Sequence, residues 1–496
     1  MRRLALVLLA VGAYAQYAPS IPRTWDDAAI ESIELPLPAS EYSPVHVRAE
    51  FYYQIPVRPI YKSYPIYAPG KEPSGYFEWM LQQEPEIAFD ASRLKAEADW
   101  LRAGEIVFDA PVSFDTAGHF AAPIRREAVR DPGWYSQTGI PVARDGVMPY
   151  ASYVIRKKGE IEVGNFSCAS CHTRVMPDGT VLKGAQGNFP LDAIEAYREG
   201  NLENDQEAMR AARRGWRFLF ATPWLKPDPI EQLSFQEIVA ARATIPPGVL
   251  GRQRTSPLSP VQIPDLIGLK DRRYLDRTGL VRHRDIADLM RYAALNQGAD
   301  SFASFGGFVP SVALNSRMRP PSVFRRYSDE QLYALALYLY SLQPPPNPNR
   351  FDRVAARGQQ IFDREGCAAC HTPPLYTNNK LMPVERFQVP EDHYRKYDIL
   401  PVVIGTDPGL TLRTTRGTGY YKVPSLKGVW YRGPFEHNGS VATLEDWFDA
   451  RRLRDDYIPT GFVGYGLKTR AVRGHEFGLK LSQDDRRALL AFLETL

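Results

Sequence analysis

The sequence predicts a mainly α fold in which two units of the same layout follow one another, with long loops and a short β-hairpin inserted. Three observations predict it. The pattern Gly-x-x-[Val/Ile]-Phe-Asp ends a predicted helix at 104–109 and again at 358–363. An amphipathic helix is predicted near the far end of each unit, at 327–342 and at 481–496. Between these helices, each unit contains one Cys-x-x-Cys-His motif.

The two closing helices are predicted by their first residues and by their apolar spacing. Ser328 and Gln331 form a capping box, and Ser482 with Asp485 begins the second helix in a similar way. Apolar residues then fall at i, i+3, i+4 and i+7, which is the spacing of one helical face. They are Leu332, Leu335, Ala336 and Leu339 in the first helix and Leu489, Phe492, Leu493 and Leu496 in the second.

The two units differ in length. The cysteine motif follows the Gly-x-x-[Val/Ile]-Phe-Asp pattern after three residues in the second unit, but some fifty-five further residues are inserted before it in the first. Within this insertion, the dipeptide Lys158-Gly159 separates two short β-rich runs in 148–166. A turn dipeptide between two such runs predicts a β-hairpin.

The composition divides the chain after residue 15 into four segments. We expect residues 88–343 and 351–496 to form the two units, joined by a stiff proline-rich linker at 344–350. Residues 16–87 are rich in proline and tyrosine and have no helical period. We interpret them as an N-terminal arm that wraps over the first unit, with a docking surface for a partner as the alternative.

All four cysteines of the chain lie in the two motifs, and three kinds of site compete for them. A redox dithiol needs no adjacent histidine and requires a βαβ context, which neither flank provides. A zinc site needs two further ligands nearby. After His172 the next histidine is His283, and no cysteine lies between Cys171 and Cys367.

Attachment of c-type haem uses every residue of the motif. Two thiols about one helical turn apart add to the two vinyl groups, and the adjacent histidine reaches the iron. The sequence therefore predicts two covalently bound haems c and two cytochrome c-type haem domains. The first haem is attached to Cys168 and Cys171 with His172 as iron ligand, and the second to Cys367 and Cys370 with His371.

The N-terminal residues indicate where the protein is located, and the net charge indicates which partners it is expected to bind. Residues 1–15 read as a secretory signal, with Arg2-Arg3, an apolar run and an Ala13-Tyr14-Ala15 cleavage site. The apolar run is shorter than the roughly 20 residues that span a bilayer, so we expect a periplasmic protein with no membrane anchor after cleavage. The net charge of +4 over 496 residues is small, and nothing suggests nucleic acid as a partner.

The second axial ligand of each iron separates electron transfer from catalysis, because an open face can bind an oxidant. For the C-terminal haem the candidate is His475. It precedes the closing helix and lies close to Gly474 and Gly478, which let backbone approach a flat cofactor. A surface histidine in a turn is the alternative.

The stretch 421–449 resembles the bacterial di-haem cytochrome c peroxidases, a superfamily that also contains the di-haem rubber oxygenases. The positions that carry the resemblance are Pro424-Ser425-Leu426-Lys427-Gly428, then Pro434-Phe435-Glu436-His437-Asn438-Gly439, then Thr443-Leu444-Glu445-Asp446. The resemblance implies that oxidant binds at the N-terminal haem and that the C-terminal haem relays electrons. It covers about the last 150 residues specifically and the first half loosely.

The chain departs from the peroxidase pattern at both irons. Peroxidases usually place a methionine on the relay haem, but no methionine follows Met382. A late histidine, as in the rubber oxygenases, fits better and again indicates His475, while His437 reads as a structural residue of the conserved turn. The displaceable histidine that peroxidases often carry after the first motif is also missing, since none lies between His172 and His283.

Three options therefore remain for the N-terminal iron. Met318 precedes a closing helix, as the ligand methionine does in small cytochromes c, although methionine is usually a core residue. His283 is a candidate ligand or distal acid–base group, and its alternative is an exposed histidine between two arginines. The third option is a five-coordinate iron.

Two classes of function follow. The first is an oxidoreductase in which peroxide or dioxygen binds at the N-terminal haem and the C-terminal haem relays electrons. The second is a non-catalytic electron carrier with both irons six-coordinate. The chain is far longer than a carrier of two haems requires, which favours the enzyme. In either case we expect a redox partner protein, a small cytochrome or a cupredoxin.

Overall fold

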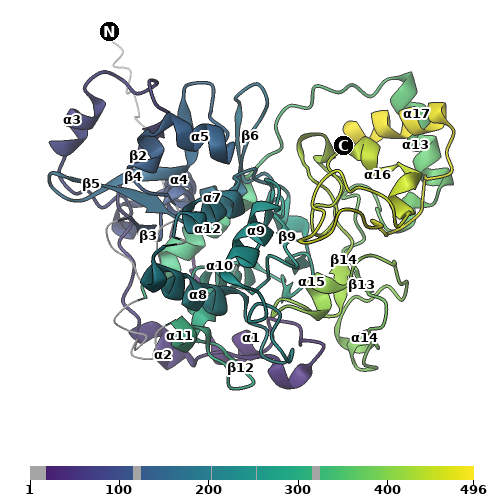
Figure 1. Ribbon diagram of the computed structural model, residues 1–496, viewed down its shortest axis with the longest axis horizontal. Coiled ribbons are helices and arrows are strands. Elements are labelled where there is room, and N and C mark those ends of the chain that lie inside the picture. The colour runs from purple at the N-terminus through teal and green to yellow at the C-terminus, as the bar shows by residue number, and fades with distance from the viewer. Residues whose placement is uncertain (1–17, 116–123, 203, 253, 315–323) are drawn as a thin grey trace, which may run out of the picture.

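The computed structural model describes residues 18–115, 124–202, 204–252, 254–314 and 324–496. It is helix-rich, with small antiparallel sheets. The chain up to α12 (Asp329–Ser341) forms the larger body, and the C-terminal helices, green to yellow in Figure 1, lie to one side of it. Within the described ranges, no helix has the length and apolarity needed to cross a bilayer.

Each unit is built on a pair of helices that cross at a glycine. In the first unit α4 (Glu97–Asp109) packs on α12, and in the second α13 (Arg353–Arg364) packs on α17 (Gln483–Glu494). A Cβ on Gly104 would lie 2.1 Å from the carbonyl oxygen of Ala334, and one on Gly358 would lie 1.9 Å from that of Ala488. Glycine in the shared sequence pattern is therefore required by close helix contact.

The predicted starts of both closing helices are confirmed. The Ser328 hydroxyl accepts a hydrogen bond from the backbone N–H of Gln331, whose side chain accepts from the Ser328 N–H. The Ser482 hydroxyl accepts one from the N–H of Asp485. Their apolar faces are buried against the partner helices, as the spacing predicts.

The predicted hairpin is present and is part of a larger sheet. Strands β4 (Val147–Lys157) and β5 (Glu160–Asn165) turn at Gly159, whose φ of 81° suits glycine. They are the centre of a four-stranded sheet with the order β2-β4-β5-β3, in which β2 is Ser63–Tyr67 and β3 is Ser113–Phe114. The outer strand β2 comes from the N-terminal arm.

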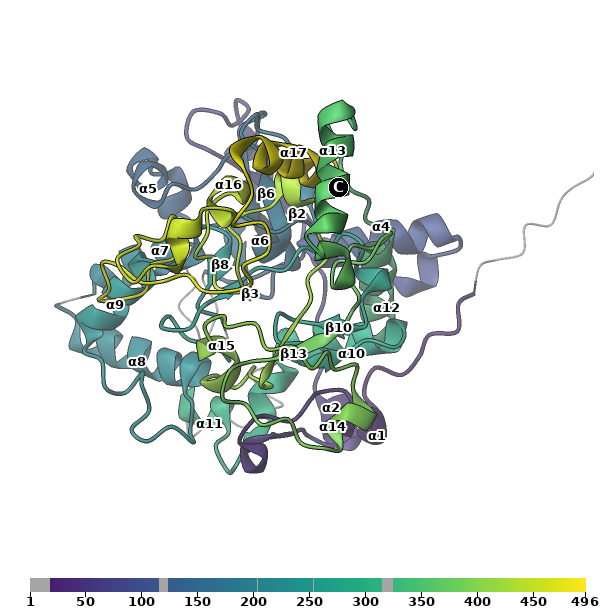
Figure 2. The same ribbon diagram turned by 90° about the vertical axis from the view of Figure 1, so that its right-hand side faces the viewer.

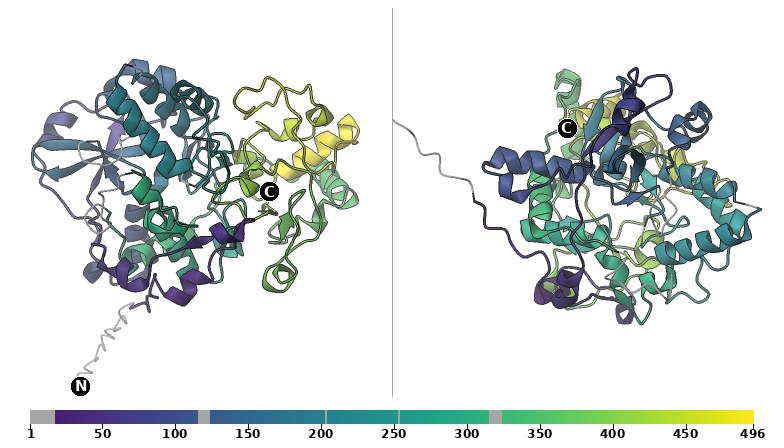
Figure 3. Two further views of the ribbon diagram at one scale, coloured as in Figure 1. Left: turned by 60° about the horizontal axis from the view of Figure 1, so that its bottom comes forward. Right: turned by 90° about the vertical axis from the view of Figure 1, so that its left-hand side faces the viewer.

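The arm contributes to the core of the first unit and contains short helices, although its sequence shows no helical period. These are α1 (Asp27–Glu31), α2 (Ala49–Gln54) and α3 (Tyr76–Leu81). Trp25 is fully buried and stacks on Tyr52, with ring centroids 4.3 Å apart. The purple segment in Figure 3 shows the arm running along the larger body.

An additional helical layer follows the first cysteine motif. After α6 (Cys168–His172), β6 (Thr173–Val175) and β7 (Val181–Lys183) come the helices α7 (Leu191–Gly200), α8 (Gln206–Phe220) and α9 (Phe235–Ala243). α8 and α9 enclose an apolar cluster of their own. In α9, Arg242 pairs in the interior with Asp192 and Glu199 of α7. Figure 2 shows α8 and α9 at the edge of the molecule.

The structure reveals a second internal repeat that the sequence analysis missed. Residues 264–281 and 424–441, 160 positions apart, follow the same path. Each begins with Pro-x-Leu-x-Gly, continues through a 3-10 turn, η4 (Leu269–Asp271) or η8 (Val429–Tyr431), and closes a small antiparallel loop. Asp276 and Glu436 occupy the same left-handed position, each with a φ of 69°.

The two copies of this repeat contact each other where the units meet. The Tyr431 hydroxyl of the second copy donates to the Asp265 carboxylate of the first at 3.0 Å. Gln262, two residues before the first copy, donates from its backbone N–H to the carbonyl of His437 and from its side chain to the carbonyl of Pro434. Near the first copy, Arg416 forms a buried ion pair with Asp276 at 2.7 Å. The C-terminal unit is therefore joined to the larger body through the segments that flank both cysteine motifs.

The remaining elements are mostly short, with α10 (Ile286–Asn296) as the longest. In the larger body they are η1 (Ser40–Tyr42), β1 (Pro44–Val45), η2 (Ala91–Arg93), η3 (Ala128–Arg130), α5 (Pro132–Thr138), β8 (Val249–Leu250), β9 (Val261–Gln262), β10 (Tyr274–Leu275), β11 (Val281–Arg282), α10 (Ile286–Asn296), η5 (Ala299–Phe302), β12 (Ser304–Phe305) and α11 (Pro310–Leu314). In the C-terminal unit they are η7 (Cys367–Ala369), β13 (Leu381–Pro383), α14 (His393–Lys396), α15 (Gly409–Leu412), β14 (Tyr420–Lys422), α16 (Leu444–Trp447) and η9 (Ala450–Leu453).

Candidate functional site

The first cysteine motif is a single helical turn fixed at both ends. The Ser167 hydroxyl accepts from the N–H of Ser170, and the Ser170 hydroxyl donates to the carbonyl of Tyr150 in β4 at 2.7 Å. On the other side, a Cβ on Gly187 would lie 2.0 Å from the carbonyl oxygen of Cys171. The turn is thus held between the sheet and a tightly packed loop.

The two motif histidines make the same hydrogen bond. His172 Nδ1 lies 3.1 Å from the carbonyl oxygen of Pro264, and His371 Nδ1 lies 3.1 Å from that of Pro424. These prolines are equivalent positions of the second repeat. Because a carbonyl only accepts, Nδ1 carries the proton and Nε2 has the lone pair that binds a metal.

The surroundings keep both rings neutral. Burial lowers the pKa of His172 to about 4, and the nearby Arg252 and Arg272 contribute to the shift. Burial also lowers the pKa of His371. A neutral imidazole with Nδ1 hydrogen-bonded to a carbonyl is the form in which histidine ligates iron.

The cysteines are unlike those of a redox dithiol. Burial raises the pKa of Cys168 to about 12 and that of Cys171 and Cys367 to about 11, whereas redox-active dithiols have a lowered pKa. In the part of the chain that the structure describes, no three His, Cys, Asp or Glu side chains gather to hold an ion directly. These observations favour neither a redox dithiol nor a zinc site at the two motifs.

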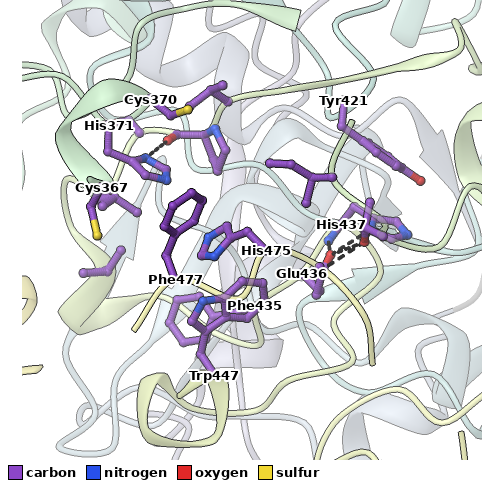
Figure 4. Close-up of a pocket in the computed structure, with 18 of the residues that line it drawn as sticks. Cys367, Cys370, His371, Tyr421, Phe435, Glu436, His437, Trp447, His475 and Phe477 are labelled. Carbon is purple, nitrogen blue, oxygen red and sulfur yellow. Dashed lines mark hydrogen bonds and ion pairs between the residues drawn. The ribbon is translucent and has the colours of Figure 1, made fainter. Parts of the chain in front are cut away.

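The C-terminal motif opens into a cavity that is lined mainly by apolar side chains. It holds about 1580 Å³ of space not filled by atoms, including its open mouth. Cys367, Cys370 and His371 line it together with His475, and Figure 4 shows both histidine rings in the same space. A cavity of this kind, lined by both thiols, two histidine rings and many apolar side chains, fits a flat apolar macrocycle.

His475 lies beside aromatic rings with a free ring nitrogen. Its Nδ1 is buried and has no hydrogen-bond partner, and its ring lies 5.3 Å from that of Trp447 and 5.5 Å from that of Phe477. Burial lowers its pKa to about 4, and His371 lowers it further, so the two histidines are close. Arg452 donates to the His475 carbonyl at 2.7 Å and fixes the backbone there.

His437 is held differently. Its Nδ1 lies 2.9 Å from a carboxylate oxygen of Glu436, and its ring stacks on Tyr421 with centroids 4.4 Å apart (Figure 4). Glu436, at its left-handed position, and His437 line both this cavity and a neighbouring cavity that is also lined by Asp407 and Arg470. These contacts agree with a structural residue of the turn.

His283 is buried, with both ring nitrogens in hydrogen bonds. Nδ1 lies 2.6 Å from the carbonyl oxygen of Arg272, and Nε2 lies 2.6 Å from the hydroxyl of Tyr340 in α12. These contacts give no support to a role as a distal group or ligand. It is also not exposed, in contrast to the alternative interpretation. Met318 lies outside the described residues.

A basic cluster between the two motifs was not anticipated. It consists of Arg272, Arg277, Lys422 and Arg432, which come from the second repeat and the residue that precedes it by two positions. Arg277, Lys422 and Arg432 line the large cavity. The Nε atom of Arg432 is buried without a partner. Because haem carries two propionates, cations at this place add to the fit of the donor set for c-type haem.

Comparison with known proteins gives two curated relatives. A cytochrome-c peroxidase of Denitromonas iodatirespirans, IdrP1, is 30% identical over 167 residues, which cover 29% of this chain and 40% of the relative. IdrP1 of Pseudomonas sp. (strain SCT) is 26% identical over 166 residues, which cover 30% of this chain and 41% of the relative. The match thus spans about two fifths of the length of these relatives. The sequence matches no protein-family model.

Two solved structures are more distantly similar. A hydrazine synthase of Kuenenia stuttgartiensis is 16% identical with a TM-score of 0.29, over 59% of this chain and 88% of that one. A MauG-like protein associated with microbial copper homeostasis is 21% identical with a TM-score of 0.21, over 34% and 56%. Neither score is high enough to inform the fold. The curated matches, at modest identity, fit the bacterial di-haem cytochrome c peroxidase superfamily.

Proposed function

We propose that the protein is a periplasmic di-haem c-type oxidoreductase. Peroxide or dioxygen binds at the haem of Cys168, Cys171 and His172, and electrons arrive through the haem of Cys367, Cys370 and His371. The observation that carries the proposal is an asymmetry between two similar sites. Both motif histidines are held by a proline carbonyl, but only the C-terminal one has, among the described residues, a second buried histidine beside it with a free nitrogen.

The chain's own residues prepare each site. Pro264 and Pro424 orient the motif histidines through Nδ1, and burial keeps the rings neutral. At the C-terminal site, His475 would supply the second iron ligand, which would suit electron transfer with little rearrangement. When bound, haem supplies an iron that exchanges single electrons and takes an oxidant at an open face.

The curated relatives support an enzyme over a simple carrier, since both are cytochrome-c peroxidases. The oxidant and the donor are part of the proposal. A small cytochrome or a cupredoxin supplies electrons at the C-terminal haem. The secretory signal predicted at 1–15 is consistent with haem attachment outside the cytoplasm.

The second candidate is a non-catalytic electron carrier. It requires a protein ligand on the second face of the N-terminal iron, and Met318 is the residue that the sequence offers. The carrier predicts two low-spin irons in the oxidised protein. The oxidoreductase predicts one high-spin and one low-spin iron.

The experiment is electron paramagnetic resonance of the oxidised, haem-loaded protein with and without cyanide. We expect a high-spin signal from the N-terminal iron that disappears when cyanide binds, and peroxide-dependent oxidation of a reduced small cytochrome. If all the iron is low-spin and the reduced protein ignores peroxide and dioxygen, the carrier replaces the enzyme.

Two variants sharpen the result. If Met318 is a ligand, the Met318→Ala protein gains a high-spin signal that the wild type lacks. His283→Gln tests the distal role, because a structural histidine can be replaced without changing the rate of cyanide binding. If His283→Gln loses reactivity with cyanide or peroxide at unchanged haem content, His283 has a distal role at the N-terminal haem.

A further inference from the structure

Four basic side chains converge between the two cysteine motifs. Arg272 follows η4 and Arg432 follows η8, and they occupy the same position in the two copies of the second repeat. Arg277 follows β10, and Lys422 ends β14. The backbone N–H of Lys422 donates to the Arg277 carbonyl at 3.1 Å, which fixes these two segments side by side.

These cations are bound mostly by backbone carbonyls. Arg272 donates to the carbonyls of Asp265 and Ile267, and Lys422 donates to that of Tyr274 at 3.1 Å. Arg432 donates to the Ser425 carbonyl at 2.8 Å. Arg277 makes only long contacts of 3.5 Å with the carbonyls of Gln262 and Ile263.

Few carboxylates balance the charge. Asp265 accepts from the Tyr431 hydroxyl at 3.0 Å and lies 4.0 Å from Arg432. Asp276 lies nearby, but its carboxylate is paired with Arg416 at 2.7 Å. Asp265 also accepts from the Ile267 N–H, so both carboxylates already have other partners. Even with Asp271, which acts on Arg272, three carboxylates face four cations and Arg416.

The pKa values of the cluster reflect the same excess of positive charge. Burial lowers the pKa of Arg277 to about 9, and Arg432 and Arg272 lower it further. Burial also holds the pKa of Lys422 well below its usual value, with contributions from Arg272 and Arg277. Cations brought together out of bulk water are stable only with anions beside them.

The two repeat arginines each belong to one site. Arg272 is close enough to His172 to lower its pKa, and Arg432 acts on His371 in the same way. Arg277 lies near both arginines, since Arg272 and Arg432 each lower its pKa. Lys422 lies near Arg272 and Arg277, which both lower its pKa, and it lines the C-terminal cavity together with Arg277 and Arg432. The cluster is thus continuous from one motif to the other.

We propose that Arg272, Arg277, Lys422 and Arg432 form one anion site that binds propionates of both haems. Arg272 serves the N-terminal haem and Arg432 the C-terminal haem, while Arg277 and Lys422 lie between and serve both. The inference rests on the proposed di-haem function. A cation beside a haem stabilises the reduced state, so the shared cations raise the reduction potentials of both haems together.

The test is Arg277→Gln, measured by spectroelectrochemistry of the haem-loaded protein. We expect both midpoint potentials to fall, each by about tenfold in the one-electron equilibrium constant, which is about 59 mV. The propionate bending bands in the resonance Raman spectrum should shift as well. Arg277→Lys keeps the charge and should restore most of both potentials. If Arg277→Gln does not fold, Lys422→Gln is the second variant.

The matched control is Arg273→Gln. Arg273 is adjacent to Arg272 in sequence, but its side chain is 63% exposed and pairs with Asp398 at 3.1 Å, so neither potential should move. A fall in only one potential, or in neither, overturns the shared site. Potentials that change on adding inorganic phosphate to the wild type also overturn it, because a free anion would then occupy the cluster. A haem count other than two, from an alkaline pyridine spectrum, contradicts the di-haem proposal instead.

Discussion

The two units of this protein share the features that surround the motif histidine, and they differ in the residues that would face the other side of the cofactor. Both contain a helix pair that crosses at a glycine, a Cys-x-x-Cys-His turn and a proline carbonyl that accepts from the motif histidine. The second unit adds His475 at its cavity. The first unit instead adds a sheet and a helical layer around its motif.

This difference distinguishes the residues that would attach a haem from those that would set the reactivity of its iron. The residues that would hold a haem, namely the thiols, the histidine and its proline, are repeated position by position. The residues that would decide what the iron does are not repeated. A duplicated frame can therefore support an electron-relay site and an oxidant-binding site in one chain, provided that the second face is changed in only one copy.

The largest expected effect is loss of one haem at a time. Cys168→Ala with Cys171→Ala should leave one haem per chain, with the low-spin spectrum of the C-terminal site. Cys367→Ala with Cys370→Ala should leave the other, with the high-spin spectrum. Intact mass and an alkaline pyridine spectrum of the denatured protein measure the count. If the two double variants have identical spectra, the two irons do not differ in spin state and the predicted difference between the sites is wrong.

The next effect concerns the second face of the C-terminal site. His475→Ala should convert that haem to high spin, because the histidine ring that lies close to His371 is removed. His437→Ala is the control, since its ring is held by Glu436 and Tyr421. If His437→Ala changes the spin state and His475→Ala does not, the ligand has been assigned to the wrong histidine.

A smaller effect tests the frame that the units share. Gly358→Ala and Gly104→Ala each place a methyl group within about 2 Å of a helix carbonyl, so each should destabilise its unit by about 3 kcal/mol. Gly215→Ala in α8 is the control, because its Cβ meets nothing within 4 Å. It should stabilise the protein by about 0.5–1 kcal/mol. Chemical unfolding of the three variants measures the difference, and equal effects would mean that the crossings tolerate a side chain.

The smallest effect belongs to the first unit alone. Glu34 of the arm is buried, 2.9 Å from His46 and 3.0 Å from Arg254, which itself pairs with Asp300. Although burial opposes ionisation, these partners hold the pKa of Glu34 below its usual 4.5. The pair therefore contributes stability above pH 4.5 that is lost as the pH falls below that value.

Glu34→Gln should lower the free energy of unfolding by about 2 kcal/mol at neutral pH, because charge-assisted hydrogen bonds are lost. The gap to the wild type should narrow as the pH falls below 4.5. Glu31→Gln is the control, since that side chain is 75% exposed. A gap that is the same at pH 7 and pH 3 would show that the charge of Glu34 does not matter.

Elements that depend on local sequence could be predicted. Capping at Ser328 and Ser482, the turn at Gly159 and the helices that end in the shared pattern follow from residue type and spacing, and they are present. The helix content was predictable for the same reason. The two cysteine motifs were visible because the chain has no other cysteines.

What was missed depends on long-range packing. The repeat from Pro264 and from Pro424 has no helical or strand period, and the spacing from the motif histidine differs, so only direct comparison of the Pro-x-Leu-x-Gly segments could have found it. The basic cluster has no signal in any one segment, because Lys422 and the arginines meet only in the fold. His283 was interpreted from its charged neighbours, whereas its hydroxyl partner lies 57 residues away in sequence.

The spacing between histidine and proline shows how such a protein can grow. The two residues are 92 positions apart in the first unit and 53 in the second, yet the hydrogen bond has the same length. Closing the longer loop costs only about 0.5 kcal/mol more in chain entropy. The inserted α8 and α9 have their own apolar cluster, which offsets the cost of ordering them. This segment is therefore a natural insertion point, where evolution or a protein engineer can add a folded module without moving the cofactor's anchor.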